Sequence, residues 1–259
     1  MKRKVKELKR IARGNLTGNY LVLMKAYIWI NALVMLVELP FSMLQTEELW
    51  SSQNIIYLIA QLLISIVSIV LISGQYKMHL SVARTGKADS RDLFSVFKNQ
   101  PDRYILANLI VFGISLVCLI PTFGSLAILH YFDSLAWTLV ALVLNVISFI
   151  LTLYVTLTYN LVFYLMLDTE ELSAIEALKA MRQMMQTHKR RYLYMQFSFL
   201  GMLFLCVLSL GVGLLWVEPY MTQTTTLFYL DTKGELDEIQ SERRKLEETP
   251  EPSIFNQYV

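Results

Sequence analysis

The sequence predicts an all-α fold, a polytopic membrane bundle of six transmembrane helices arranged as three hairpins, with cytoplasmic interfacial helices. Hydrophobic residues make up 55% of the 259 residues and charged residues only 17%, and the mean hydropathy is +0.46. Soluble domains carry about 25% charged residues, so this composition is typical of a chain embedded in lipid. In addition, all but one of the 23 Lys and Arg residues fall in four blocks, at positions 2–13, 77–103, 179–191 and 233–245.

The basic blocks predict the orientation of the chain. Loops rich in Lys and Arg stay on the cytoplasmic side of a membrane. Between successive blocks the sequence is apolar, then briefly polar, then apolar again, so that the chain can cross and return each time. We therefore expect a multi-pass protein of the cell membrane with both termini in the cytoplasm. Because this topology accounts for the basic charges, no nucleic acid partner is expected.

Six segments approach the length of about 20 apolar residues that a spanning helix needs. They are residues 20–43, 54–73, 104–120, 135–167, 192–209 and 214–230. The sixth is interrupted by Glu218, Pro219 and a threonine run, and we retain it because the fourth basic block would otherwise lie outside. We predict one integral membrane domain over residues 1–231, followed by a charged, mobile cytoplasmic tail over 232–259 that is helical in part.

A basic helical segment precedes the first, third and fifth predicted spans. Each segment ends just before a tyrosine, and these tyrosines, Tyr20, Tyr104 and Tyr192, recur at nearly equal spacing. Such spacing suggests three copies of one unit, an interfacial helix followed by a membrane hairpin. In the first segment, Val5, Leu8 and Ala12 are expected to form a narrow apolar stripe. In the second segment, Leu93, Val96 and Phe97 are expected to face the bilayer.

The third basic segment is the best defined. Ser173 and Glu176 match a capping box, the signature of a helix start. After this cap one face of the helix is apolar and the other polar, which is typical of a helix in the headgroup plane. The apolar face holds Ile175, Leu178, Met181 and Met185. The cations after it, Lys189, Arg190 and Arg191, are candidate contacts for anionic lipid, each contributing about 1 kcal/mol near the surface.

The sequence contains no familiar catalytic motif and no Cys or His cluster at metal-ligand spacing. The three histidines, His79, His130 and His188, are assigned to different loops or segments and are not expected to converge. We therefore expect a protein that is not an enzyme, with no catalytic residues, no metal and no cofactor.

Polar residues inside the predicted spans form a candidate intramembrane polar site. Its members are Glu38, Asn31, Glu218, Thr222 and Thr225, with both acids expected in the outer half of the membrane. Two interpretations remain open. Polar side chains can join helices by hydrogen bonds of about 0.6 kcal/mol each, or they can line a path for a solute. Lys25 is expected near the inner end of its helix, where it can extend its ammonium to the headgroups.

The last predicted hairpin carries a family resemblance. It contains EALKAMRQMMQTHKRRY from residue 176 and LGVGLLWVEPYMTQTTTLFYLD from residue 210. These stretches resemble domain-of-unknown-function family 975 of multi-pass bacterial membrane proteins. The matching positions are Gly211, Gly213, Leu214, Leu215, Trp216, Pro219, Tyr220, Thr224, Thr225, Phe228, Tyr229 and Asp231. The resemblance extends over roughly the first nine tenths of the chain, and it implies an integral membrane protein without an established activity.

Two functional hypotheses follow. The first is a non-enzymatic membrane component that organises or regulates protein partners or lipids, because the basic amphipathic segments can contact anionic headgroups on the cytoplasmic side of the bilayer. The alternative is a small transporter or permease with a polar bundle interior. A water-filled path through the polar residues would favour transport, whereas a closely packed bundle would favour the first hypothesis.

Overall fold

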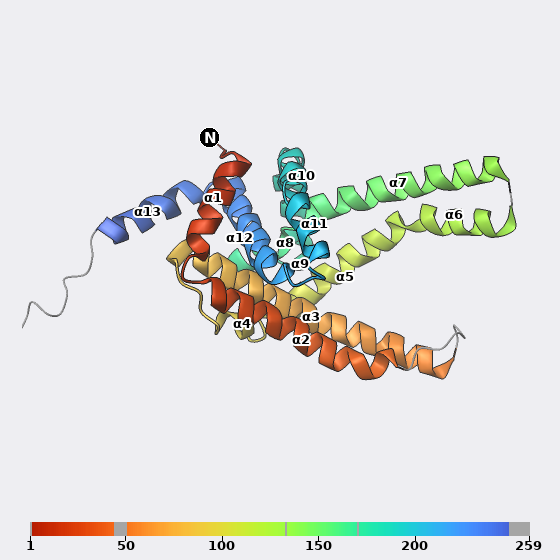
Figure 1. Cartoon of the computed structure of the whole chain (residues 1–259), viewed down its shortest axis with the longest axis horizontal. Coiled ribbons are helices and arrows are strands. Elements are labelled where there is room, and N and C mark those ends of the chain that lie inside the picture. The colour runs from red at the N-terminus through yellow and green to blue at the C-terminus, as the bar shows by residue number, and fades with distance from the viewer. Residues whose placement is uncertain (1, 44–50, 133, 170, 249–259) are drawn as a thin grey trace, which may run out of the picture. The chain divides into compact units, whose positions relative to one another are not determined.

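The computed structural model describes residues 2–43, 51–132, 134–169 and 171–248, and this part of the chain is helical without a strand. The all-α prediction is therefore confirmed for the described residues. The chain divides into two compact units. Unit 1 comprises Met1–Lys98 and Met195–Val259, and unit 2 comprises Asn99–Tyr194. Figure 1 shows the helices of both units, which we describe separately.

Unit 1 contains a long hairpin of α2 (Tyr20–Ser42) and α3 (Ser52–Thr85). The Ser51 hydroxyl accepts a hydrogen bond from the Asn54 backbone N–H at 3.2 Å and starts α3, and Gly86, with a φ of 79°, ends it. The 34 residues of α3 extend for about 51 Å, whereas the hydrocarbon layer is about 30 Å thick. Apolar side chains are exposed in the first half of α3, whereas the second half, from Val70, is largely buried.

A helical body surrounds the second half of α3. It consists of α1 (Val5–Leu16), the short α4 (Asp92–Ser95), α12 (Leu214–Lys233) and α13 (Leu236–Glu248). The helix α11 (Leu200–Leu208) packs on α12, and α10 (Lys189–Phe197) leads into it from unit 2. The centre of the body is formed by the end of α12, where Leu227, Phe228, Tyr229 and Leu230 are fully buried.

The contact between α3 and α4 depends on a glycine. A β-carbon placed on Gly74 would lie 2.0 Å from the backbone oxygen of Leu93. No side chain fits in that space, so glycine lets the two backbones meet. Leu93 and Val96 are buried by this packing, whereas Phe97 is exposed. Of the three residues predicted to face the bilayer, two therefore pack inside the protein.

Unit 2 is built around a second hairpin. Its helices are α5 (Pro101–Cys118), α6 (Ile120–Tyr131), α7 (Leu135–Tyr159), α8 (Val162–Asp168) and α9 (Ala174–Met185). α6 packs along α7, and α9 packs on α5, α7 and α8. Asn145 donates to the Ser125 hydroxyl at 2.8 Å, and Ser148 donates to the Cys118 carbonyl at 2.6 Å. Polar residues here join helices, which is one of the two interpretations given above for polar residues inside the predicted spans.

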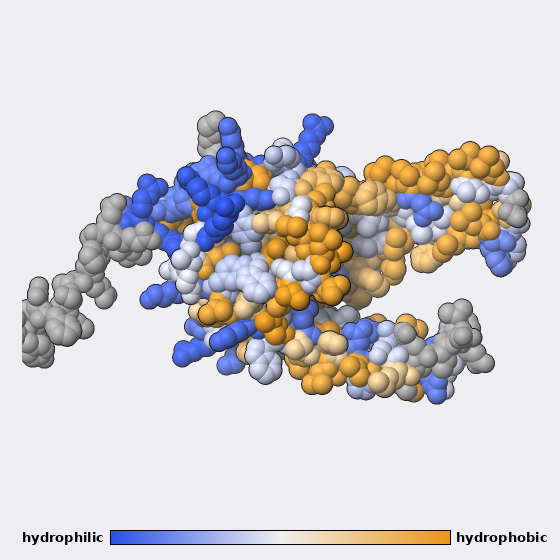
Figure 2. All heavy atoms as spheres, viewed as in Figure 1, coloured by the Kyte–Doolittle hydropathy of each residue, from blue (hydrophilic) through white to orange (hydrophobic). Residues whose placement is uncertain are grey.

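Five helical segments among the described residues are long and apolar enough to cross a membrane. They are Tyr20–Ser42, Ser52–Thr85, Pro101–Tyr131, Leu135–Asp168 and Lys189–Leu208. They are compatible with a multi-pass membrane protein and overlap the first five predicted spans. Figure 2 shows apolar residues along the α2–α3 and α6–α7 hairpins. The predicted sixth span, 214–230, lies within α12, which is not among the five, so the count of six is not confirmed.

The predicted capping box at Ser173 and Glu176 is confirmed, because each side chain bonds the other residue's backbone N–H. The apolar face of that helix meets protein, however. Leu178, Met181 and Met185 are buried where α9 packs in unit 2, and Ile175 is 52% exposed. Likewise the stripe of α1, with Val5, Leu8 and Ala12, is buried where α1 packs on α12. An amphipathic pattern requires an apolar neighbour without specifying lipid or protein.

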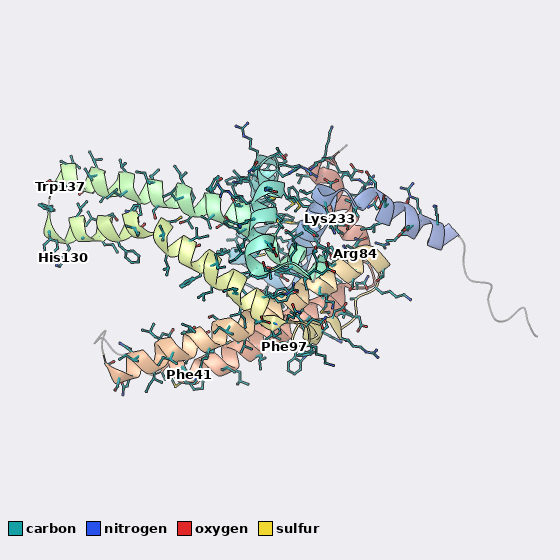
Figure 3. The ribbon with its side chains drawn as sticks, turned by 180° about the vertical axis from the view of Figure 1, so that it is seen from behind. Phe41, Arg84, Phe97, His130, Trp137 and Lys233 are labelled. Atoms are coloured by element: carbon teal, nitrogen blue, oxygen red, sulfur yellow. The ribbon has the colours of Figure 1, made fainter. Side chains whose placement is uncertain are left out.

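The beginning of the predicted tail is the helix α13, and residues 249–259 lie outside the described part of the chain. At the start of this segment Glu235 pairs with Arg84 at 3.1 Å and with Lys233 at 2.5 Å. Figure 3 shows Arg84 and Lys233 in the body and Phe41 near the free end of the α2–α3 hairpin. Whether the tail is mobile stays a prediction.

Candidate functional site

The acid Glu38 forms a polar contact between the two helices of the first hairpin. Its carboxylate accepts a hydrogen bond from the Gln61 amide at 2.8 Å, and the same amide donates to the Tyr57 hydroxyl at 3.1 Å. Asn31 does not join this contact. Its side chain is exposed and donates at 2.8 Å to the Tyr27 carbonyl of its own helix. Glu38 therefore connects α2 to α3, while Asn31 bonds only within α2.

The second acid, Glu218, lies in a different place. It accepts hydrogen bonds from the Gln75 amide at 3.1 and 3.2 Å and from the Thr222 hydroxyl at 2.8 Å. Gln61 and Gln75 are 14 positions apart on α3, which corresponds to about 21 Å along the helix. The structure thus places the two acids in separate clusters and does not bring the five candidate residues together. Thr225 is half-buried on α12.

The expected place of Glu218 in the outer half of the membrane stays a prediction. Gln75 follows the apolar half of α3 and lies just before Lys77, in a basic block. The helix that carries Glu218, α12, packs on α1, α2 and α3 in unit 1. Glu218 therefore contacts the part of α3 that directly precedes Lys77.

One turn further along, His79 and Gln223 form a buried pair. The Nδ1 atom of His79 lies 2.7 Å from the Oε1 atom of Gln223, and both side chains are 0% exposed. Within the described residues, His79 Nε2 and Gln223 Nε2 have no hydrogen-bond partner. Buried polar atoms without a partner are rare in proteins. We call the five residues along this contact, Gln75, His79, Glu218, Thr222 and Gln223, the polar seam.

The polar seam combines an acid, an imidazole, two amides and a hydroxyl between α3 and α12. These groups can donate and accept hydrogen bonds. The described residues contain no group of three or more His, Cys, Asp or Glu that could hold a metal ion. The candidate site predicted from the sequence did not include Gln75, His79 or Gln223. The spacing of four between Gln75 and His79 was the available signal, because it puts both on one helix face.

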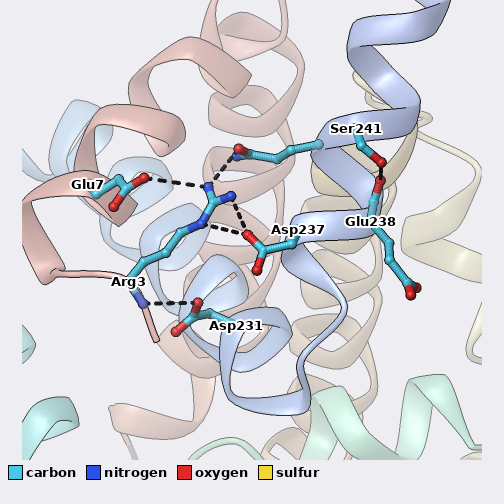
Figure 4. A network of polar contacts seen from close by, with 7 residues as sticks. Arg3, Glu7, Asp231, Asp237, Glu238 and Ser241 are labelled. Atoms are coloured by element: carbon cyan, nitrogen blue, oxygen red, sulfur yellow. Dashed lines mark hydrogen bonds and ion pairs between the residues drawn. The ribbon is translucent and has the colours of Figure 1, made fainter. Parts of the chain in front are cut away.

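A second polar cluster joins the two ends of unit 1 (Figure 4). The Arg3 guanidinium donates to Asp237 at 2.5 and 3.1 Å and to Gln240 at 2.6 Å. The Arg3 backbone N–H donates to Asp231 at 3.3 Å. Glu7 lies 3.8 Å from the same guanidinium. The N-terminal segment is therefore bonded to the end of α12 and to α13.

A buried asparagine holds the loops beside this cluster, and the sequence analysis did not identify it. The Asn19 amide donates to the Gly86 carbonyl at 2.7 Å and to the Asn15 carbonyl at 3.0 Å, and its oxygen accepts from the Ala88 N–H at 2.8 Å. Arg243 of α13 donates to the Asn15 side chain at 2.6 Å. These bonds join the ends of α1 and α3 to α13.

The cations in α1 and at its N-cap, Lys4, occupy half-buried or exposed positions. Lys9 donates to the Ser198 carbonyl at 2.8 Å, and its Nζ atom lies 3.7 Å from the centre of the Phe199 ring. Burial, and then the charge of Arg13, lower the pKa of Lys9. Lys4, Lys6, Arg10 and Arg13 are exposed, and we call these four residues the cationic face of α1. Figure 2 shows hydrophilic residues over this part of unit 1.

The candidate lipid contacts lie at the start of α10. The Lys189 Nζ atom is 3.4 Å from the centre of the Tyr154 ring, a cation–π contact within unit 2. Arg190 is exposed and Arg191 is half-buried. Lys189 is therefore already engaged by an aromatic ring, and contact of the three residues with anionic lipid stays a prediction.

Comparison with known proteins identifies one relationship. A family model described as "Protein of unknown function (DUF975)" matches residues 1–235. The match covers the polar seam and the cationic face of α1, and it ends before α13, which agrees with the resemblance seen in the sequence. No curated protein and no solved structure matches the chain.

Proposed function

The chain belongs to the DUF975 family of unknown function, and from that premise we propose that it is a multi-pass, non-enzymatic component of the cell membrane. In this proposal it organises or regulates protein partners or lipids at the cytoplasmic surface. The observation that carries the proposal is the cationic face of α1. This face is exposed on the helical body of unit 1, next to the α2–α3 hairpin.

The packing of α1 determines what this face can do. The apolar stripe of α1 is buried against protein, so the helix is held in one orientation with its cations outward. Lys6, Arg10 and Arg13 recur at a spacing that places them on one helix face. A fixed row of cations attracts anionic groups, and each cation contributes about 1 kcal/mol near an anionic membrane surface. An acidic protein or anionic headgroups would both fit this row.

The proposal places both termini in the cytoplasm. Its support is the bonding of Arg3 to Asp237 and Asp231, which joins the two ends of unit 1. Ends that lie together belong to the same side of a membrane, so the number of full crossings is even. The concentration of Lys and Arg near these ends makes that side the cytoplasm.

We propose four full crossings, made by the two long hairpins, in place of the six that the sequence predicts. Ser198 and Phe199, in the middle of the fifth apolar segment, contact Lys9, and Tyr220 of α12 accepts a hydrogen bond from Arg13 at 3.2 Å. Placing these two contacts at the bilayer centre would bury two cations there, which is costly. Both segments instead fit the cytoplasmic boundary.

In this topology α11 and the turn after it form a shallow hairpin. The nine residues of α11 extend for about 14 Å, roughly half of the hydrocarbon thickness. Its tip is apolar and exposed, and Leu210, with a φ of 52°, is 95% exposed. The other exposed apolar residues around the tip are Leu205, Val207, Leu208 and Val212. Such a tip fits insertion into one leaflet.

A test of the main proposal is photo-crosslinking from the cationic face in cells. A photoreactive amino acid at position 6 of the full chain should give a discrete adduct with a protein or lipid. Replacing Arg10 and Arg13 with Gln should remove that adduct, whereas replacing Lys87 and Lys98, two exposed cations elsewhere in unit 1, should leave it. An absent adduct, or one indifferent to Arg10 and Arg13, would contradict the proposal.

The polar seam favours a second candidate, a transporter for a small polar solute. Its support is the buried pair His79 and Gln223, each with a nitrogen that has no partner among the described residues. Glu218→Gln and Gln223→Leu should then slow the swelling of proteoliposomes in some polar solutes while leaving the adduct at position 6 unchanged. Equal swelling of wild-type, variant and protein-free vesicles across a solute panel would argue against transport.

A further inference from the structure

An apolar groove runs along the membrane hairpin of unit 1, between α2, α3 and α4. Its volume is about 550 Å³, and Ala26, Trp29, Ile30 and Leu33 of α2 line one side. Leu71, Leu93 and Phe94 belong to the opposite side. The lining is apolar except for Lys25, which lies toward its Val22 end on α2, and Ser90, which precedes α4. The groove is therefore amphipathic along its length.

The groove continues toward the middle of the hairpin. Leu33 and Leu71 also line a second hollow of about 230 Å³ between α2 and α3, which reaches Val37. Lys25 and Val37 are 12 positions apart on α2, or about 18 Å along the helix. One leaflet of the hydrocarbon layer is about 15 Å deep, half of about 30 Å. The groove thus has the depth of one leaflet.

The polar end of the groove carries an uncompensated positive charge. Lys25 is exposed, and within the described residues neither Lys25 nor Ser90 has a hydrogen-bond or ion-pair partner. The nearest acid in sequence, Asp89, is engaged, because its carboxylate accepts from the Arg91 backbone N–H at 2.8 Å. A cation and a hydroxyl are a suitable pair of donors for a phosphate oxygen.

We propose that this groove binds one anionic phospholipid of the cytoplasmic leaflet. The headgroup phosphate accepts hydrogen bonds from Lys25 and Ser90, and an acyl chain lies along Trp29 and Leu33 toward Val37. The site rests on the membrane placement in the proposed function, since it needs the α2–α3 hairpin in the bilayer. The proposed site gives a specific role to Lys25, the one Lys or Arg residue outside the four basic blocks.

Trp29 lines the groove and is 72% exposed, so it provides a probe that bound lipid can reach. In a full-length variant with Trp50, Trp137 and Trp216 changed to Phe, the fluorescence of Trp29 can be quenched by lipids brominated on the acyl chain. The protein is reconstituted in phosphatidylcholine vesicles that contain a small fraction of brominated phosphatidylglycerol or, at the same fraction, brominated phosphatidylcholine. We expect the anionic lipid to quench several-fold more than the zwitterionic one. Equal quenching by both lipids would overturn the proposal.

Matched variants test the role of Lys25. Lys25→Gln should abolish the preference for the anionic lipid, Lys25→Arg should retain it, and Lys98→Gln, at an exposed cation outside the groove, should leave it unchanged. A preference that survives Lys25→Gln would also overturn the proposal. Because resistance of the protein to alkaline extraction tests membrane insertion separately, failure of the lipid site is distinguishable from failure of the membrane placement.

Discussion

The amide of Gln75 donates hydrogen bonds to both carboxylate oxygens of Glu218, at 3.1 and 3.2 Å, and so joins α3 to α12. Gln75 is buried, so its amide cannot exchange this partner for water. Glu218→Ala should therefore leave a buried donor unpaired and lower the free energy of unfolding by about 1–3 kcal/mol. Thermal unfolding of the detergent-purified protein measures this effect.

A double variant separates the lost bond from lost packing. Gln75→Leu with Glu218→Leu removes both partners, and we expect it to be more stable than Glu218→Ala, since the buried amide of Gln75 is then not left without its acceptor. Gln183→Leu, at an exposed position of α9, serves as the control. A double variant less stable than Glu218→Ala would contradict this explanation.

The close approach of Gly74 to Leu93 predicts strong sensitivity to a single methyl group. Gly74→Ala would put a β-carbon 2.0 Å from a backbone oxygen, so α4 must move away from α3. Overpacking of this kind costs about 1–3 kcal/mol. Gly14→Ala on α1, which has nothing within 4 Å of the new β-carbon, should be neutral or stabilising by up to about 1 kcal/mol. Similar melting temperatures for the two variants would contradict the packing described.

The bonds of Arg3 predict that the N-terminus holds α13 in place. Arg3→Ala removes the hydrogen bonds to Asp237 and Gln240, and α13 should then be cut faster in limited proteolysis. Asp237 is largely exposed, so the pair itself is worth roughly 0.2–1 kcal/mol. Arg10→Ala, at an exposed cation of α1, should not change the cleavage rate. Equal rates for both variants would exclude a role for Arg3.

The capping box of α9 predicts a dependence of stability on pH. The Ser173 hydroxyl and backbone N–H bond the Glu176 carboxylate and lower its pKa. A lowered pKa stabilises the folded chain above the ordinary value, and this contribution is lost as the pH falls through the lowered pKa. Between about pH 5 and pH 3 the wild type should therefore lose more stability than Glu176→Gln.

Thermal unfolding at several pH values tests the capping box, with Glu171→Gln as a control for an exposed carboxyl nearby. The pH profile of that control should follow the wild type. A profile of Glu176→Gln that also follows the wild type would mean that the cap contributes nothing to the pH dependence.

The shallow third hairpin predicts that its tip does not reach the outer surface. In a background with Cys118 and Cys206 changed to Ala, Tyr131→Cys at the end of α6 should react with an impermeant maleimide added to intact cells. Leu210→Cys should not react, since its tip would lie within one leaflet. Lys98→Cys should react only after permeabilisation. Labelling of Leu210→Cys as fast as Tyr131→Cys would favour six crossings.

Some properties of this chain follow from sequence alone. The apolar segments, their separation by basic blocks, the capping box at Ser173 and the family resemblance depend on composition and short spacings. Five apolar segments and the capping box are confirmed in the structure. Such features are predictable because each depends on residues close together in the chain.

Tertiary structure alone decided which surfaces those helices contact. The stripes on α1 and α9 have the pattern of membrane-surface helices, yet Leu8 and Met181 are fully buried in protein. Glu38 and Glu218 looked alike in sequence, but their partners Gln61 and Gln75 hold them at different levels of α3. The physical reason is that an apolar face or a carboxyl is stabilised by any suitable neighbour, and the neighbour comes from a distant part of the chain.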